Sequence, residues 1–401
     1  MALTSKEKVN SRHLMRLFAV HMSSMIQVPP SDEKRKKMGI VIGMMLLQMI
    51  GSLILSPSIT LPKLPNLHRT IMSFNESECW NYFETRKEDL PRLLRVLRIP
   101  EDVVFDNKAT MRGEELMLRG LYELVTGNDQ NEVAVVFGCD QTRQSRSLTY
   151  FLKHVYSTFL DLLTDNLDWW YTNGYLQKSM EAIKAKMQGG DNFSTCGFID
   201  CNCLECSRPG GGPISDGYDA ERWDPSIQKA FYNGWKSIHG LKHQTFDCAY
   251  GMTVDMFGPY SLRRNDLKLL RDSRLNQRMR ELQVGALMQL TVYGDSIYPR
   301  LSHLRSSWRD KNLEQWQKIE NRAFTSTRIS IEWNYMVTGN LFSYVRNLDK
   351  LRLLGSYNVH RVYTVCTILR NCHVALYGSL TSQYFDLVIE DDMLEKYMQA
   401  K

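Results

Sequence analysis

The stretch LTVYGD at 290–295 decides the fold, because it is a short apolar run that ends in a glycine and a carboxylate. A similar run, CGFID, occurs earlier at 196–200. Short apolar runs bounded by turn residues are typical of buried strands. In an open α/β sheet, functional residues gather where the strands end. The two runs therefore predict a sheet that carries Asp200 and Asp295 at its strand ends.

Further strands and helices are expected around these two runs. Residues 243–249 and 252–257 predict a β-hairpin about the turn at Tyr250-Gly251, because apolar and other side chains alternate after the turn. Helical patterns are expected at 326–341 and again at 362–376. Strands that alternate with helices favour a mixed sheet covered by helices. The predicted fold class is therefore α/β.

A third carboxylate, Glu332, lies in the helix expected from Ser326 onward. Ile329, Trp333 and Met336 form the apolar face of that helix. Glu332 lies beside this face, so it can point toward the sheet. Three converging carboxylates repel one another unless a cation lies between them, and hard cations such as Mg²⁺ or Mn²⁺ prefer oxygen ligands. Two such ions can hold the attacking and leaving oxygens of a phosphoryl transfer. The alternative is that all three are ordinary surface acids.

The composition is that of a globular protein. The chain has 401 residues, of which 43% are hydrophobic and 23% charged, which excludes a disordered or collagen-like chain and predicts two or three structural units. The net charge of +6 permits a polyanionic partner without requiring one. Nine cysteines form no short-chain disulfide framework, so we expect reduced intracellular thiols.

Residues 1–70 are expected to be a leader and linker, since prolines interrupt the chain from Pro57 onward. Within this part, residues 38–55 carry no charge and follow four basic residues at 34–37, a pattern typical of a membrane anchor. Glycine and glutamine interruptions weaken this reading. We therefore favour a nuclear chain without a membrane anchor, with the basic run as a solvated or nuclear-import segment.

Residues 71–185 are expected to be mostly helical, with a candidate helix-turn-helix at about 131–163. An apolar helix, a glycine-containing turn and a second helix that opens near Gln144 are the layout of this motif. Gln144 and its neighbours Arg143 and Arg146 would then enter a DNA groove. An ordinary helical hairpin is the alternative.

Six segments occur in an order that carries a family resemblance. They are GFIDC at 197–201, RP at 208–209, QKAFYNGWKSIHGLKHQTF at 228–246, GP and RRND within 258–266, YGDSIYP at 293–299 and TRISIEWNYMVTG at 327–339. Together they resemble the DDE endonuclease domain of Harbinger/PIF-type transposases. The resemblance implies that Asp200, Asp295 and Glu332 are the three catalytic carboxylates, with Asp266 as an ancillary metal or structural residue.

The same resemblance implies an RNase H-like fold with a mixed five-stranded sheet at 190–345, followed by a helical C-terminal extension at 346–401. It implies a metal-dependent nuclease or transposase that uses Mg²⁺ or Mn²⁺. DNA is the implied partner, and a separate DNA-binding accessory protein and a homo-oligomer are further partners to consider. The alternative is a domesticated DNA-binding protein that does not cut. Two departures concern metal affinity: Cys201-Asn202-Cys203 and Asn265 stand where the family has histidines.

Two clusters near these motifs have two readings each. A basic run begins at Arg263 and Arg264 and continues to Arg280, either as a solvated helix face or as a contact to DNA phosphates. Four cysteines between Cys196 and Cys206 suit a zinc site by residue type but not by spacing, so free thiols are favoured.

Overall fold

The computed structural model describes residues 67–187, 194–209, 225–285, 289–353 and 355–400. The chain divides into two units, Met1–Lys63 and Leu64–Lys401, and all elements given below belong to the second. Residues 1–66 of the predicted leader, which include the apolar stretch at 38–55, lie outside the described residues. Within the described part, no helix is both long and apolar enough to cross a membrane.

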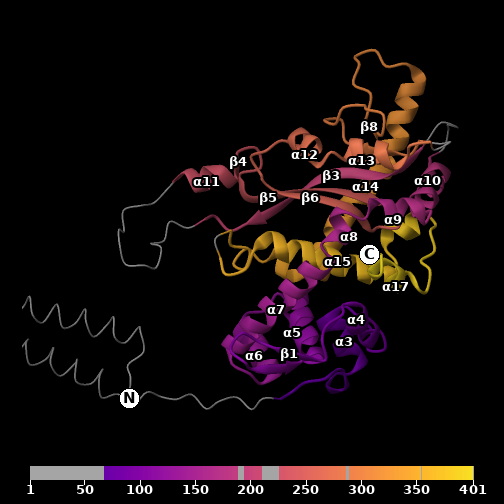
Figure 1. Ribbon diagram of the computed structural model, residues 1–401. Helices are drawn as coiled ribbons and strands as arrows, with labels where there is room; N and C mark the ends of the chain where they lie inside the picture. Colours follow the sequence, from indigo (N-terminus) through magenta and orange to yellow (C-terminus); the bar gives the residue numbers. More distant parts are fainter. Residues whose placement is uncertain (1–66, 188–193, 210–224, 286–288, 354, 401) are drawn as a thin grey trace, which may run out of the picture. The chain divides into compact units, whose positions relative to one another are not determined.

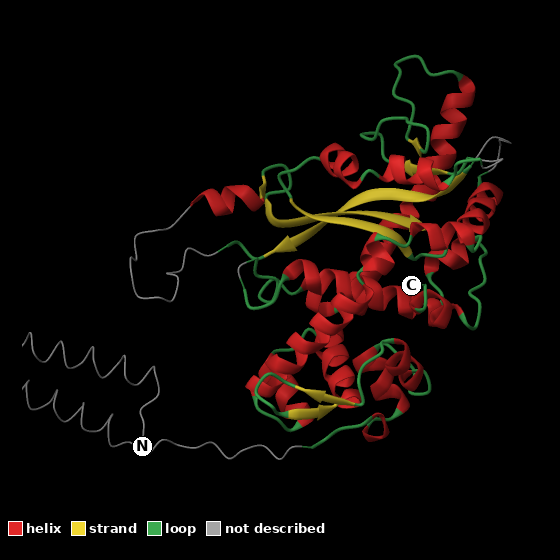
Figure 2. Ribbon diagram, in the orientation of Figure 1, coloured by secondary structure: helices red, strands yellow, loops and turns green. Residues whose placement is uncertain are grey.

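The centre of the second unit is a six-stranded mixed sheet with the order β4-β5-β3-β7-β8, in which β6 also pairs with β5 (Figures 1 and 2). The strands are β3 (Thr195–Cys206), β4 (Tyr232–Asn233), β5 (Ile238–Cys248), β6 (Thr253–Ser261), β7 (Thr291–Gly294) and β8 (Leu304–Arg305). β3 is antiparallel to β5 and parallel to β7, and β7 is parallel to β8. The predicted α/β class and the β5–β6 hairpin are confirmed, and the sheet has one short strand more than the five that the resemblance implies.

Helices flank this sheet. They are α8 (Asp161–Thr164), α9 (Leu167–Thr172), α10 (Tyr175–Lys186), α11 (Pro225–Phe231), α12 (Asp266–Ser273), α13 (Leu275–Leu282) and α14 (Gln315–Leu341). The hydroxyl of Ser179 on α10 donates to the carbonyl of Cys196 on β3 at 2.6 Å. The ring of Phe324 on α14 stacks on that of Tyr293 on β7, with centroids 4.0 Å apart. These contacts fix both helices against the central strands.

The N-terminal part of the described unit is mainly helical. Its elements are η1 (Ile71–Ser73), α3 (Glu76–Phe83), α4 (Leu90–Val96), β1 (Asp102–Val104), β2 (Thr110–Arg112), α5 (Gly113–Thr126), α6 (Gln130–Phe137) and α7 (Gln141–Phe159). The expected pair at 131–163 is thus present as α6 and α7, with α7 ending at Phe159 before the short α8 begins. The helical pairing is observed, and its use as a DNA reader stays a prediction.

The C-terminal part is helical as expected, with η2 (Ser343–Arg346), α15 (Val359–Tyr377), α16 (Leu380–Tyr384) and α17 (Met393–Met398). α15 is buried on nearly all sides, and its residue Asn371 accepts a hydrogen bond from the backbone of Thr253 on β6 at 3.0 Å. One apolar core continues from α3 through the sheet to α17. The division of this unit near 185 and 345 therefore stays a prediction.

Candidate functional site

Asp200 and Asp295 follow the last paired residues of two neighbouring parallel strands. Ile199 of β3 pairs with Gly294 of β7, so the next residue on each strand is a carboxylate. Gly294 is required here, because a Cβ at this position would lie 2.5 Å from the ring of Tyr298 and 2.9 Å from Ile199. The sheet thus places the two carboxylates side by side.

One detail of this prediction is wrong, because Asp200 does not end its strand. β3 continues to Cys206, and its residues from Cys201 onward stay paired with β5. Only β7 ends at this point. The edge at which the site opens is therefore made by the end of β7 against the middle of the longer β3.

Asp200 lies in a largely buried position, with 21% of its side chain exposed. Its Oδ1 accepts a hydrogen bond from the backbone N–H of Cys201 at 2.7 Å. Burial raises the pKa of Asp200 to about 6; the Cys201 hydrogen bond and Arg328 oppose this rise, and Asp295 and Asp266 add to it. The ionised form of Asp200 is therefore less stable than that of an exposed carboxylate, and a further cation nearby would stabilise it.

Arg328 lies between Asp200 and Glu332. Its Nη1 is 3.5 Å from Oδ2 of Asp200, and its Nη2 is 3.2 Å from Oε1 of Glu332, one turn later on α14. The Glu332 side chain is 54% exposed, whereas that of Arg328 is 24% exposed. Asp200 and Glu332 are therefore linked through the guanidinium of Arg328, and no direct contact joins the two carboxylates. Sequence reasoning missed Arg328, although it stands four residues before Glu332 in the quoted TRISIE motif.

The predicted apolar face of α14 is wrong. Ile329 and Met336 are 44% and 56% exposed, while Phe324 and Ile331 are buried against the sheet. The helix begins at Gln315, well before the expected Ser326, and its packing is set by the stacked Phe324. Most of the other buried residues of α14 are polar, so a pattern of apolar residues alone does not identify this face.

Asp266 is the first residue of α12 and is neutralised by a lysine. Its Oδ1 lies 2.7 Å from Nζ of Lys242, which also donates to the carbonyl of Arg264 at 2.8 Å. The side chain of Asn265 caps the helix by accepting the backbone N–H of Lys268 at 2.9 Å. Asp266 is close enough to influence the pKa of Asp200, and its ion pair gives it a structural part beside the two strand carboxylates.

The donor chemistry fits a hard divalent cation. Asp200, Asp295 and Glu332 offer oxygen atoms only, which Mg²⁺ and Mn²⁺ prefer. In the described ranges, no three His, Cys, Asp or Glu side chains already stand in a metal-binding group. The guanidinium of Arg328 lies between Asp200 and Glu332 and pairs with both. The use of Asp200, Asp295 and Glu332 as cation ligands stays a prediction.

Residues 215–371 match a family model described as DDE superfamily endonuclease. The match contains Asp266, Asp295 and Glu332 and begins after Asp200. It indicates a nuclease or transposase-like function with DNA as substrate, and such endonucleases generally use divalent metals. No curated protein and no solved structure matches the chain.

The predicted DNA-reading residues of α7 have different environments. Gln144 is fully buried and donates to Glu123 at 2.8 Å, so its expected place in a DNA groove is wrong. Arg143 is half-buried and its Nη2 donates to the carbonyl of Thr110 at 3.3 Å. Arg146 is exposed at the rim of a pocket on α7. Of the three, Arg146 is the most accessible to a partner.

The pair α6–α7 is also tied to the C-terminal part of the chain. The hydroxyl of Tyr357, just before α15, lies 3.0 Å from that of Ser145 on α7 and accepts a hydrogen bond from Gln130 on α6. Tyr357 therefore covers part of the first turns of α7.

The basic run after β6 separates into two groups. Arg263 and Arg264 are exposed in the turn before α12, where they can meet a phosphate. Arg278 instead pairs with the buried Asp255 at 2.7 Å.

The nine cysteines are free, and because β3 alternates its faces, Cys203 and Cys206 point to opposite sides of the sheet. This favours thiols over a zinc site.

Proposed function

We propose that this protein is a metal-dependent DNA endonuclease or transposase of the Harbinger/PIF type, with Asp200, Asp295 and Glu332 as its catalytic carboxylates. The observation that carries the proposal is that Asp200 and Asp295 each follow the last residue pair of the parallel strands β3 and β7, and that Arg328 pairs with both Asp200 and Glu332. The family match over residues 215–371 supports the same chemistry.

Mg²⁺ or Mn²⁺ held by these carboxylates would supply the positive charge that a phosphodiester displacement needs. The chain's own contribution is to fix the carboxylates. The N–H of Cys201 orients Asp200, and the N–H of Ile297 orients Asp295 at 2.7 Å. α14 brings Glu332 to the same edge of the sheet.

DNA would be held by basic residues near this edge and on α7. Arg263 and Arg264 lie next to Asp266 and are exposed, so they can contact phosphates on the strand that is cut. Arg146 offers a second contact, with Arg143 beside it. An accessory DNA-binding protein or a second copy of the chain would extend this surface, and the nucleus is the compartment in which such an activity would meet its substrate.

The second candidate is a DNA-binding protein of the same fold that does not cut. It is favoured by one observation, the ion pairs of Arg328 with both Asp200 and Glu332. If this arginine stays in place when metal is present, the third carboxylate never reaches the site.

The deciding experiment measures the melting temperature of the full chain with and without Mn²⁺, together with nicking of supercoiled DNA. Metal binding to the folded state should raise the melting temperature, and Asp295→Asn and Glu332→Gln should each abolish the rise and the nicking. Glu205→Gln, an exposed acid on the same strand as Asp200, is the control and should behave as the wild type. A full metal-dependent rise in both site variants would refute the carboxylate site. A rise that vanishes in the variants, without any nicking by the wild type, would favour the second candidate.

A further inference from the structure

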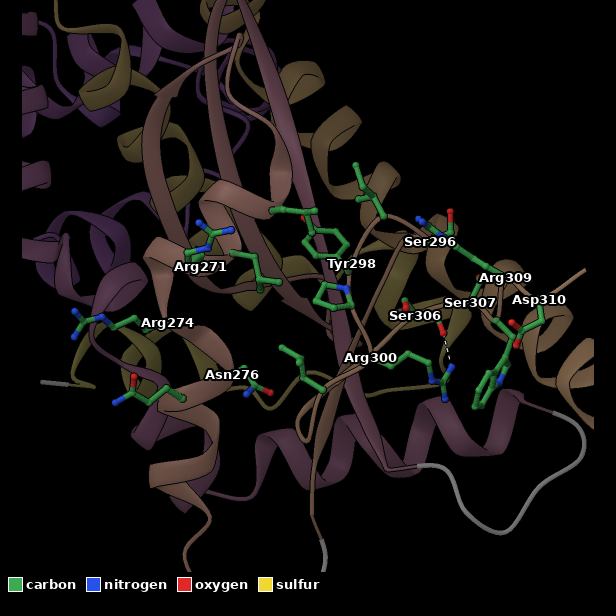
Figure 3. Close-up of a pocket in the computed structure, with 17 residues that line it drawn as sticks. Arg271, Arg274, Asn276, Ser296, Tyr298, Arg300, Ser306, Ser307, Arg309 and Asp310 are labelled. Atoms are coloured by element: carbon green, nitrogen blue, oxygen red, sulfur yellow. Dashed lines mark hydrogen bonds between the residues drawn. The ribbon is translucent and has the colours of Figure 1, made fainter.

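A pocket of about 750 Å³ is lined by Ser296 and Tyr298, which follow Asp295 closely in the chain (Figure 3). One wall is the loop that begins with Ser296, Ile297 and Tyr298, immediately after the carboxylate. A second wall is formed by α12 and α13, and a third by the segment up to Asp310. The hydroxyl of Tyr298 lies 3.4 Å from Sγ of Cys201, next to Asp200. The pocket and the candidate metal site therefore share a border.

The rim of the pocket carries three exposed arginines. Figure 3 shows Arg271 and Arg274 on one side and Arg309 on the other. All three are exposed, and none forms an ion pair with another residue that the structure describes. Asp310 is the single acid among the lining residues. An anionic ligand is the electrostatic complement of this rim.

Arg300 differs from these three, because it is part of the rigid wall. Its guanidinium carbon lies 3.7 Å from the ring centroid of Trp308, and its Nη2 lies 3.3 Å from Oε1 of Glu320. Trp308 in turn donates its indole N–H to Glu320 at 2.6 Å. These contacts join Arg300, Trp308 and Glu320 at the far side of the pocket.

The interior of the pocket is largely apolar. Ile297 and Leu301 are 39% and 45% exposed, and Leu270 and Pro299 complete the lining between the arginines. A small inorganic anion would use the rim and leave these side chains uncovered. A nucleotide matches both parts of the pocket, because its flat base can contact the apolar lining and its phosphate can contact the arginines at the rim. The volume lies in the range of small-molecule sites, about 300–1,000 Å³.

We propose that this pocket takes an unpaired nucleotide of the DNA strand that passes Asp295. The choice of DNA rests on the proposed function. The base would contact Ile297 and Leu301, and the flanking phosphates would contact Arg271 and Arg274. A base that remains stacked in a duplex cannot enter a concave site, so the nucleotide must be flipped out or lie in a single-stranded end. The pocket would thereby select DNA whose helix is open next to the cleaved bond.

The test is equilibrium binding of the full chain to fluorescent DNA in EDTA, which removes metal and cleavage from the measurement. A blunt duplex is compared with the same duplex that carries a short 3′ overhang. The wild type should bind the overhang DNA roughly tenfold more tightly, the effect of one base held by protein side chains. Ile297→Trp fills the pocket and should abolish this preference without changing affinity for the blunt duplex. Ile297→Ala leaves the pocket open but removes one contact to the base, so it should weaken the preference without abolishing it.

The arginines are tested by the salt dependence of the same binding. Arg271→Ala and Arg274→Ala should each lower the log–log slope for the overhang DNA by roughly 0.7, the value for one phosphate contact on a single strand. Arg280→Ala, which removes an exposed arginine of α13 outside the pocket, is the control and should leave the overhang preference intact.

Two outcomes would overturn the proposal: equal affinity for both DNAs, or a preference that Ile297→Trp retains in full. These failures are distinguishable from failure of the proposed function. A wild type that nicks DNA with Mn²⁺ but shows no overhang preference has the function without the pocket. A wild type that prefers the overhang but never nicks has the pocket without the cleavage.

Discussion

The guanidinium of Arg328 lies 3.5 Å from the carboxylate of Asp200 and so puts a built-in cation at the edge of the sheet. Asp200 is largely buried and neighbours Asp295, so a positive charge there offsets both burial and repulsion. The same guanidinium binds Glu332 at 3.2 Å. A metal ion and Arg328 would therefore compete for the same oxygens.

Removing Arg328 should strengthen metal binding. Arg328→Ala frees the oxygens of Asp200 and Glu332, and the loss of a partly exposed competing ion pair worth up to about 1 kcal/mol corresponds to Mn²⁺ binding that is tighter by up to roughly fivefold. The measurement is a titration of the melting temperature with Mn²⁺. Arg328→Lys keeps the charge and should stay close to the wild type. Weaker binding by Arg328→Ala would mean that the arginine helps to assemble the site.

Gly294 should tolerate no side chain. In Gly294→Ala the new Cβ meets Tyr298 at 2.5 Å and Ile199 at 2.9 Å, so the free energy of unfolding should fall by about 1–3 kcal/mol. Urea denaturation measures this change. Gly234→Ala is the matched control, since its nearest neighbour is 4.0 Å away, and it should unfold like the wild type. Equal stability of the two variants would contradict the close pairing of β3 with β7.

Two stacked histidines should make the protein sensitive to acid. Nε2 of His243 lies 3.1 Å from Nδ1 of His360, and burial lowers their pKa values to about 3 and about 4. In the unfolded chain both titrate near 6.5, so the unfolded state binds more protons below that pH. Above about pH 6.5 both histidines are neutral in the folded and unfolded states and do not affect the free energy of unfolding. As the pH decreases toward about 4, the free energy of unfolding falls by up to about 1.4 kcal/mol per pH unit for each histidine.

The measurement is the free energy of unfolding between about pH 7 and pH 4.5, the window set by these pKa values. His360→Asn removes one of the two groups and should flatten the decline, whatever its effect at neutral pH. His68→Gln, which changes a side chain that is 67% exposed, should keep the wild-type slope. An identical decline in His360→Asn would show that other groups cause the acid sensitivity.

Arg146 and Arg143 should differ in DNA binding. Arg146 is exposed, so Arg146→Ala should lower the salt slope for duplex binding by roughly 0.9. Arg143 donates to the carbonyl of Thr110, so Arg143→Ala should chiefly lower the melting temperature and change the slope less. Salt-dependent anisotropy and thermal melting of both variants check this. An unchanged slope in Arg146→Ala would place the duplex on another face.

The sheet edge was predictable from the sequence because its signal is local. The runs before Asp200 and Asp295 are apolar and short, and both form strands at the expected places. The extension of β3 to Cys206 was not predictable, because it is held by backbone pairing with β5 and not by a pattern of its own. Strand ends therefore depend on the neighbouring strand as much as on the segment itself.

The surroundings of the carboxylates were harder to predict, because they depend on contacts between distant segments. Arg328 looks like an ordinary helical arginine until α14 is placed on the sheet. Gln144 looks like a groove-reading residue until Glu123 and Arg119 of α5 are brought against it, with Glu123 2.8 Å away. In both cases one polar side chain is committed to a partner far away in the sequence, and no periodicity reports such a pairing.

The hydrogen bonds of Tyr357 have a consequence for evolution and engineering. A helix pair that reads DNA is often regarded as an interchangeable cassette. In this protein Gln130 of α6 and Ser145 of α7 share one phenol supplied by a segment more than two hundred residues later in the chain. Transplanting α6 and α7 alone would leave those two polar groups without their partner, so the pair can be inherited or exchanged intact only together with the segment that carries Tyr357.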